Sequence, residues 1–105
     1  MADVIANKED IFRRVRDNQF RLRALGVCRL ALFGSFVRGE QTPHSDVDLL
    51  VEFEPDRKTF DNFMALSFFL EEILRRRVEL VTPESLSPFL GPHILAEAEY
   101  APLAA

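Results

Sequence analysis

Apolar residues recur at helical spacing near the start of the chain. The pattern predicts a helix between Asn7, whose side chain can cap the first turn, and Gly26, which favours a helix end. Its apolar face is formed by Ile11, Val15, Leu22 and Leu25. Its exposed face carries Arg13, Arg14, Arg16, Arg21 and Arg23. Most such side chains are simply solvated, and the alternative that some of them serve a partner or a phosphate stays open.

After Gly26 the spacing of apolar residues changes from that of a helix to that of a β-strand. Residues 27–33, VCRLALF, predict a strand in which Cys28 is a small buried residue. One face of this strand is expected to hold Val27, Arg29, Ala31 and Phe33. Residues 34–40 contain two glycines that break the strand, and residues 41–45 have the composition of a turn. Within that turn, Thr42 and Ser45 are expected to shape the backbone, and His44 to be a loop residue.

Four further elements follow. Residues 46–55 predict a second strand that ends at Pro55, and residues 77–81 predict a short third strand. Between them, a long helix starts at Thr59 or Asp56 and runs to about Arg75. Pro83 suits the first turn of a short helix, and a final helix is predicted from Gly91-Pro92 to near Tyr100. The order of elements predicts a small α/β or α+β fold with about three strands.

The long helix at residues 59–75 is apolar around most of its circumference. At about 100° per residue its apolar side chains span roughly 260°, whereas packing on one sheet needs little more than about 100°. Part of this helix should therefore face something other than its own sheet. Either the C-terminal helix covers it, or it forms a homodimer or partner interface.

Length and composition limit the protein class. At 105 residues, of which 48% are hydrophobic, we expect one domain over residues 1–105. No apolar run approaches the ~20 residues of a membrane span, and the first residues lack a signal core, so a cytoplasmic protein is expected. One cysteine excludes an internal disulfide and a zinc site built from four cysteines.

Charge is unevenly distributed. Thirteen basic and 17 acidic residues give a net charge of −4, which argues against a dedicated nucleic-acid binder. Residues 39–61 alone hold seven acids and two bases, a local balance of 2 − 7 = −5. This acidic segment suits divalent cations or basic partners, and the alternative is a solvated acidic loop.

Two short motifs carry candidate chemistry. Gly34-Ser35 follows the first strand directly, where glycine allows a sharp turn and nearby amides can point at a phosphate. Asp46 and Asp48 stand two residues apart at the head of the second strand, so both carboxylates project from one face. Their mutual repulsion is relieved by a divalent cation, and oxygen ligands suit Mg²⁺.

Glu79 on the third strand can join these carboxylates if its strand lies beside the second. Three carboxylates could hold two cations and a triphosphate, one cation activating the attacking oxygen and the other stabilising the leaving pyrophosphate. Each motif alone is weak evidence, because Gly-Ser is usually a turn and Asp-x-Asp is often incidental. Together they form the pattern G-S, ten residues, D-x-D, in a setting of strand, glycine turn and strand.

In this combination the segment ALFGSFVRGEQTPHSDVDLLVEF resembles the nucleotidyltransferase signature of the DNA polymerase β superfamily. The ending RVELVTPESLSPFLGPHILAEAEY is similar to its minimal, single-domain branch, the MNT-type antitoxins. The resemblance covers about residues 8–100, and GSFVRG and SDVDLLV are its specific part. It implies the nucleotidyltransferase fold, a small mixed β-sheet of three or more strands flanked by helices.

The resemblance also implies roles for individual residues. Gly34 and Ser35 would cradle the β- and γ-phosphates of the nucleotide, and Asp46 and Asp48 would bind two Mg²⁺ ions. Glu79 stands where a third carboxylate is expected, a position that is often aspartate. Whether Glu79 is the base that takes the proton from the acceptor hydroxyl, a metal ligand or neither stays open.

Arg38 lies close to the glycine turn in the sequence. It could steady a phosphate or pyrophosphate, and a salt bridge to Glu40 or Asp46 is the alternative. Larger relatives complete the nucleotide pocket with a second domain that we do not find in these 105 residues. We therefore expect an open site, weak affinity for free nucleotide and dependence on a partner.

The function implied is Mg²⁺-dependent transfer of a nucleoside monophosphate, AMP from ATP in the leading case, to a protein hydroxyl. Relatives of this type are encoded beside HEPN-domain ribonuclease toxins, and some silence the toxin by adding AMP to one of its tyrosines. A second hypothesis is a catalytically idle antitoxin that neutralises its partner by complex formation. A third is a metal-dependent nucleotide hydrolase.

Overall fold

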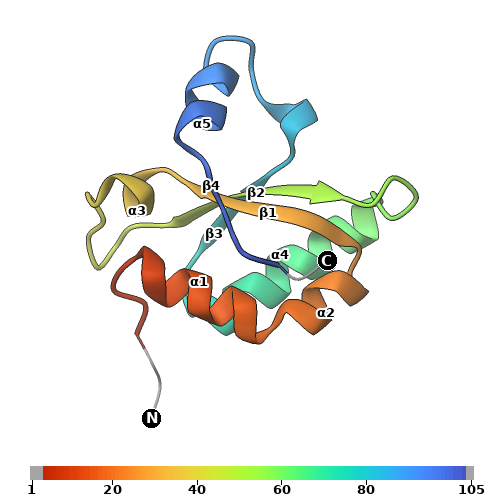
Figure 1. Ribbon diagram of the computed structural model, residues 1–105, viewed down its shortest axis with the longest axis horizontal. Helices are drawn as coiled ribbons and strands as arrows, with labels where there is room; N and C mark the ends of the chain where they lie inside the picture. The colour runs from red at the N-terminus through yellow and green to blue at the C-terminus, as the bar shows by residue number, and fades with distance from the viewer. Residues whose placement is uncertain (1–3, 104–105) are drawn as a thin grey trace.

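The computed structural model of the protein describes residues 4–103, in which helices are interspersed with strands along the chain (Figure 1). The order is α1 (Lys8–Asp17), α2 (Gln19–Ala24), β1 (Val27–Phe33), α3 (Ser35–Arg38), β2 (Val47–Phe53), α4 (Phe60–Leu74), β3 (Val78–Val81), the 3₁₀ helix η1 (Pro83–Ser85), α5 (Gly91–Glu97) and β4 (Glu99–Tyr100). Asn7 caps α1 by accepting from the Asp10 N–H at 3.0 Å, and Thr59 caps α4 by accepting from the Asn62 N–H at 3.1 Å.

The strands form one sheet in the order β3-β2-β1-β4. β1 runs antiparallel to both β2 and β4, while β2 and β3 are parallel and are connected through α4. A parallel pair needs such a crossover, because the chain must return to the end of the sheet where the first strand began before the second strand can start. This four-stranded mixed sheet with flanking helices confirms the predicted fold class.

The end of the chain differs from the prediction. The final helix stops at Glu97, because Ala98 is extended (φ −62°, ψ 135°), and Glu99 and Tyr100 pair with β1 instead of continuing the helix. The prediction of a helix to near Tyr100 is therefore wrong for its last residues. Two residues are too few to show a strand period, so only pairing with β1 reveals this fourth strand.

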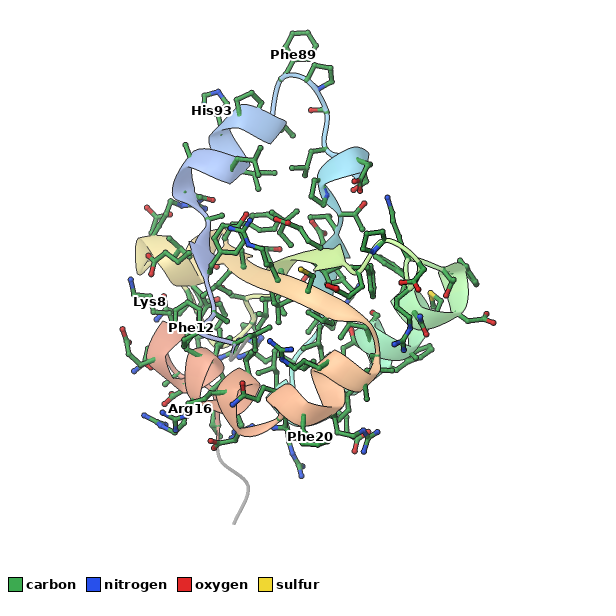
Figure 2. All side chains as sticks on the ribbon, turned by 45° about the vertical axis from the view of Figure 1, so that its right-hand side comes forward. Lys8, Phe12, Arg16, Phe20, Phe89 and His93 are labelled. Carbon is green, nitrogen blue, oxygen red and sulfur yellow. The ribbon has the colours of Figure 1, made fainter. Side chains whose placement is uncertain are left out.

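The two faces of the sheet are covered unequally (Figure 1). Helices α1, α2 and α4 lie on one face, which we call the covered face, and the main core lies between them and the sheet. Helix α5 stands on the other face, which we call the open face, where Ala31, Phe33 and Leu50 form a small buried cluster. The segment before α5 projects outward, with Phe89 at its tip, 85% exposed (Figure 2).

The N-terminal helix is divided in two. Asn18 leaves helical geometry (φ −113°, ψ 17°), and its side chain donates to the Arg14 carbonyl at 2.8 Å. An asparagine side chain competes with the backbone for hydrogen bonds, which accounts for the break. The predicted apolar face nonetheless survives the break, since Ile11, Val15 and Leu22 are all buried.

Strand β1 departs from simple alternation. A β-bulge between Val27 and Arg29 shifts the pairing register with β2. Val27 consequently packs in the main core on the covered face, whereas Ala31 and Phe33 belong to the open-face cluster. The prediction that these residues share one face is wrong for Val27. The prediction that Cys28 is buried is also wrong, because its side chain is exposed.

Helix α4 is packed from one side by the sheet and from another by α1. Arg21 adds a cation–π contact, with its guanidinium carbon 4.8 Å from the centre of the Phe69 ring. The C-terminal helix does not cover α4, because α5 stands on the opposite face of the sheet (Figure 1). Phe60 and Phe68 remain 76% and 64% exposed, so a homodimer or partner interface on α4 stays a prediction.

Within residues 4–103, no helix has the length and apolar character needed to cross a membrane.

Candidate functional site

The glycine turn after β1 brings the two sequence motifs together. Gly34 has φ 82° and ψ −153°, a conformation that side chains disfavour, and α3 begins at the next residue, Ser35. A Cβ atom at Gly34 would stand 2.1 Å from Oδ2 and 2.9 Å from Cγ of Asp48. Two separate reasons therefore require glycine at position 34: the backbone conformation and the close approach of the Asp48 carboxylate.

Strand pairing places the three predicted carboxylates on neighbouring strands. Phe33 is the β1 partner of Asp48, and Glu79 is its partner on the parallel strand β3. Asp46 precedes β2 by one residue, and Val47 between the two aspartates is fully buried in the main core. Since side chains alternate along a strand, Asp46 and Asp48 point to the opposite, open face.

The electrostatics of the site centre on Asp48, which is half-buried. Burial, followed by the negative charges of Glu79 and Asp46, raises the pKa of Asp48 to about 6, while the positive charge of Arg38 acts in the opposite direction. The negative charge of Glu97 is a further contribution to the raised pKa. The carboxylates therefore repel one another without a sufficient counter-charge.

A divalent cation is the group that this arrangement favours. Carboxylate oxygens are the ligands that Mg²⁺ prefers, and a bound cation would offset both the burial of Asp48 and the negative charges of Glu79 and Asp46 that raise its pKa. Among residues 4–103, no three His, Cys, Asp or Glu side chains are gathered closely enough to form a ready metal site. The residues thus fit the ion by donor chemistry and by their shared face, with Asp46 and Glu79 still exposed.

Arg38 at the end of α3 is held by two carboxylates. Its Nε donates to Glu40 at 2.9 Å, and its Nη1 donates to both oxygens of Glu97 at 3.0 and 3.1 Å. The hydrogen bonds to Glu40 and then to Glu97 raise the pKa of Arg38 above its ordinary value. Of the two alternative salt bridges raised by the sequence, the one to Glu40 is present and Asp46 is not a partner.

Glu97 is the site residue that sequence reasoning missed. Besides Arg38, it accepts a hydrogen bond from the Gly34 N–H at 2.8 Å. It follows Gly34 by 63 positions and lies outside the GSFVRG and SDVDLLV segments, so no spacing within those motifs could have identified it. Only the fold brings α5 to the glycine turn.

The loop before Asp46 is held by hydrogen bonds from its own side chains and from Arg76. Ser45 Oγ accepts from the Thr42 N–H at 2.8 Å, which confirms that these two residues shape the turn. Arg76 donates to the carbonyls of Thr42, Pro43 and Ser45, the last at 2.8 Å. These contacts hold the backbone that leads into Asp46.

Comparison with known proteins agrees with this geometry. Residues 14–101 match the family described as Nucleotidyltransferase domain. The protein adenylyltransferase MntA of Thermococcus cleftensis is 41% identical over 75 residues, which cover 71% of this chain and 75% of that protein. Among solved structures, a minimal nucleotidyltransferase is similar with a TM-score of 0.74 and 38% identity, over 90% of this chain and 95% of that chain.

A second solved structure, described as a toxin–antitoxin with AMP-PNP, is similar with a TM-score of 0.65 and 25% identity, over 94% of this chain and 75% of that chain. The matched family region contains the glycine turn, the Asp46–Asp48 pair and Glu79. The chain therefore belongs to the nucleotidyltransferase domain family, and it is an enzyme of the nucleotidyl-transfer class.

Proposed function

We propose that this chain transfers AMP from ATP to a hydroxyl group of a partner protein in a Mg²⁺-dependent reaction, and that it acts as the antitoxin of a HEPN-type toxin in the cytoplasm. The observation that carries the proposal is the contact of the Gly34 turn with Asp48, a phosphate-binding type of turn set directly against a pair of aspartates. The relative named protein adenylyltransferase and the toxin–antitoxin structure with AMP-PNP support the choice of AMP and of a protein partner.

The chain's own residues divide the work between binding and proton transfer. Ser35, at the start of α3, and Arg38, at its end, bind the phosphates of the nucleotide. Asp46, Asp48 and Glu79 would hold two Mg²⁺ ions. When bound, the ions neutralise charge on the triphosphate and on the leaving pyrophosphate.

In the reaction the acceptor oxygen forms a bond to the α-phosphorus, and the bond from that phosphorus to pyrophosphate breaks. Glu79 is the residue we propose as the base that takes the hydroxyl proton. It is exposed, and it stands beside Asp48 on the neighbouring strand. An incoming hydroxyl can therefore reach Glu79 from solvent.

The open face of the sheet supports a protein as the acceptor. The carboxylates lie on this face, which carries α5 and the short helix η1, whereas α1, α2 and α4 lie on the other face (Figure 1). On the same side of the sheet, Phe89, Leu90 and Leu95 in the projecting segment and α5 expose apolar side chains, at 85%, 62% and 50%. A partner protein that docks on this face would bring its hydroxyl to the site and exclude water.

The first test uses intact mass spectrometry. Purified protein is incubated with ATP, Mg²⁺ and a HEPN-domain protein encoded beside it, and the partner is expected to gain the mass of one or more AMP units. Asp46→Asn and Asp48→Asn should each lower the rate at least about a hundredfold, because they remove a metal ligand while keeping the side-chain volume. Asp56→Asn is the matched control, since Asp56 lies in the same acidic segment but beyond β2.

The alternative outcomes are distinct. Neutralisation of the toxin without any gain in mass, and unaffected by Asp48→Asn, would mean that the chain acts by complex formation. Release of free AMP from ATP without labelling of the partner would mean that it is a hydrolase. Either result would overturn the proposal.

A further inference from the structure

The C-terminal segment places one carboxylate, that of Glu97, against the candidate site. Glu97 is the last residue of α5, and its side chain is 25% exposed. Its Oε2 accepts from the Gly34 N–H at 2.8 Å, and its two oxygens accept from Nη1 of Arg38 at 3.0 and 3.1 Å. One side chain thus connects α5 to Gly34, which precedes α3, and to Arg38, the last residue of α3.

The surroundings of Arg38 indicate what the contact with Glu97 does for this side chain. The Arg38 side chain is 49% exposed, and it lies close enough to Asp48 to lower the pKa of that carboxyl. A long and flexible cation beside a half-buried carboxylate pairs with it unless another group holds the cation. Glu40 accepts a hydrogen bond from Nε of Arg38, and Glu97 accepts one from Nη1. Within residues 4–103, the Nη2 group of Arg38 has no acceptor.

We propose that Glu97 is a positioning residue for nucleotide binding, a role that rests on the proposed function. It holds Arg38 by Nη1, keeps it from pairing with Asp48, and leaves Nη2 available for a phosphate oxygen of a nucleoside triphosphate. Through the Gly34 N–H it also keeps the turn closed against Asp48. Because the guanidinium is ordered before the nucleotide arrives, less side-chain entropy is lost on binding.

The contacts of Glu97 with the Gly34 N–H and Arg38 have a second possible explanation. A carboxylate that accepts from a backbone N–H and an arginine could instead occupy the position of a phosphate, which the nucleotide would then have to displace. The two explanations predict opposite changes when Glu97 is removed. A positioning residue makes nucleotide binding weaker when it is lost, and a competitor makes it tighter.

The experiment measures binding of AMP-PNP with Mg²⁺ by calorimetry, together with KM and kcat for AMP transfer. Glu97→Ala is expected to weaken binding and raise KM about tenfold, the usual effect of losing a charge-assisted hydrogen bond, with little change in kcat at saturating ATP. Glu97→Gln keeps an acceptor for the Gly34 N–H and should lose less. Thermal unfolding of each variant establishes that it is folded.

Glu99→Ala is the matched control, because Glu99 lies two residues further on the same segment. Its carboxylate pairs with Lys8 of α1 at 3.0 Å and makes no contact with the site. It should leave binding and KM unchanged. In the Arg38→Ala background, Glu97→Ala should cause a clearly smaller loss than in the wild type, since the part of its effect that passes through Arg38 is already gone.

Several results would overturn the inference. Equal effects of Glu97→Ala and Glu99→Ala would show that the segment is merely structural, and tighter AMP-PNP binding by Glu97→Ala would make Glu97 a competitor. A full additional loss in the Arg38→Ala background would exclude action through Arg38. If the wild-type chain binds AMP-PNP but transfers no AMP, the proposed function fails, while the binding affinities still decide the role of Glu97.

Discussion

The two faces of the sheet have opposite characters, although they are made from the same strands. On the covered face, Leu30, Leu32, Leu49 and Val51 are almost completely buried beneath α1, α2 and α4. On the open face, a three-residue cluster stands beside Asp48 and Glu79. Neighbouring residues on one strand can therefore differ sharply, as fully buried Val47 and charged, half-buried Asp48 do.

The covered face contributes mainly to the stability of the fold, and the open face carries the candidate chemistry. Burial of apolar side chains provides most of the folding free energy, and in this protein it is concentrated on the covered face. The open face holds carboxylates that repel one another, a cost that the rest of the fold must offset. Substitutions on the covered face should therefore change mainly the free energy of unfolding, and substitutions at the site mainly binding and transfer.

The largest expected effect is on the covered face. Leu70 of α4 is completely buried, so Leu70→Ala should lower the free energy of unfolding by about 2–5 kcal/mol, through lost burial and the cavity left behind. Leu95→Ala on α5 is the comparison, and because Leu95 is half exposed we expect less than about 1 kcal/mol. Urea unfolding measures both. Equal losses would mean that the open face contributes to stability as much as the covered face.

A smaller effect distinguishes the two glycines around α3. Gly34 and Gly39 both have positive φ, 82° and 72°, so alanine strains either backbone. Only at Gly34 does the added Cβ collide with Asp48, whereas at Gly39 it meets nothing within 4 Å. Gly34→Ala should thus cost about 1–3 kcal/mol more than Gly39→Ala and should abolish AMP transfer. Retained transfer in Gly34→Ala would show that the contact with Asp48 is dispensable.

The smallest expected effect is the pH dependence caused by Asp48. Its folded-state pKa of about 6 lies above its ordinary value, so between about pH 4 and 6 the folded chain binds more protons than the unfolded chain. Stability from this group is therefore present at low pH and is lost as the pH rises through 6. Asp48→Asn should remove this slope and stabilise the metal-free protein at pH 7 by about 1 kcal/mol, a value reduced for partial exposure to solvent.

Urea unfolding of wild type and Asp48→Asn from pH 4 to 8 measures the difference. Added Mg²⁺ should stabilise the wild type and not the variant, since it binds the ionised carboxylate. A variant that is less stable than wild type at pH 7 without metal would contradict the account of Asp48 as a carboxylate destabilised by burial and by neighbouring negative charges.

Much of the fold could be predicted because its signals are local. The helical spacing of Ile11, Val15 and Leu22 and the apolar runs of β1 and β2 depend only on neighbouring residues, and the structure confirms them. The failures are positions where a tertiary contact decides. The β-bulge after Val27 depends on the partner strand, and the pairing of Glu99 and Tyr100 depends on the free edge of β1.

The candidate site divides in the same way. The glycine turn, the aspartate pair and the chemistry of their oxygen donors could be predicted from the sequence, because they depend on residue type and short spacing. The tertiary structure alone decided that Asp48 lies against Gly34, that Glu79 stands beside it and that Glu97 holds Arg38. Those contacts join residues far apart in the chain, and they exist only because the strands pair in one register and α5 packs on the open face.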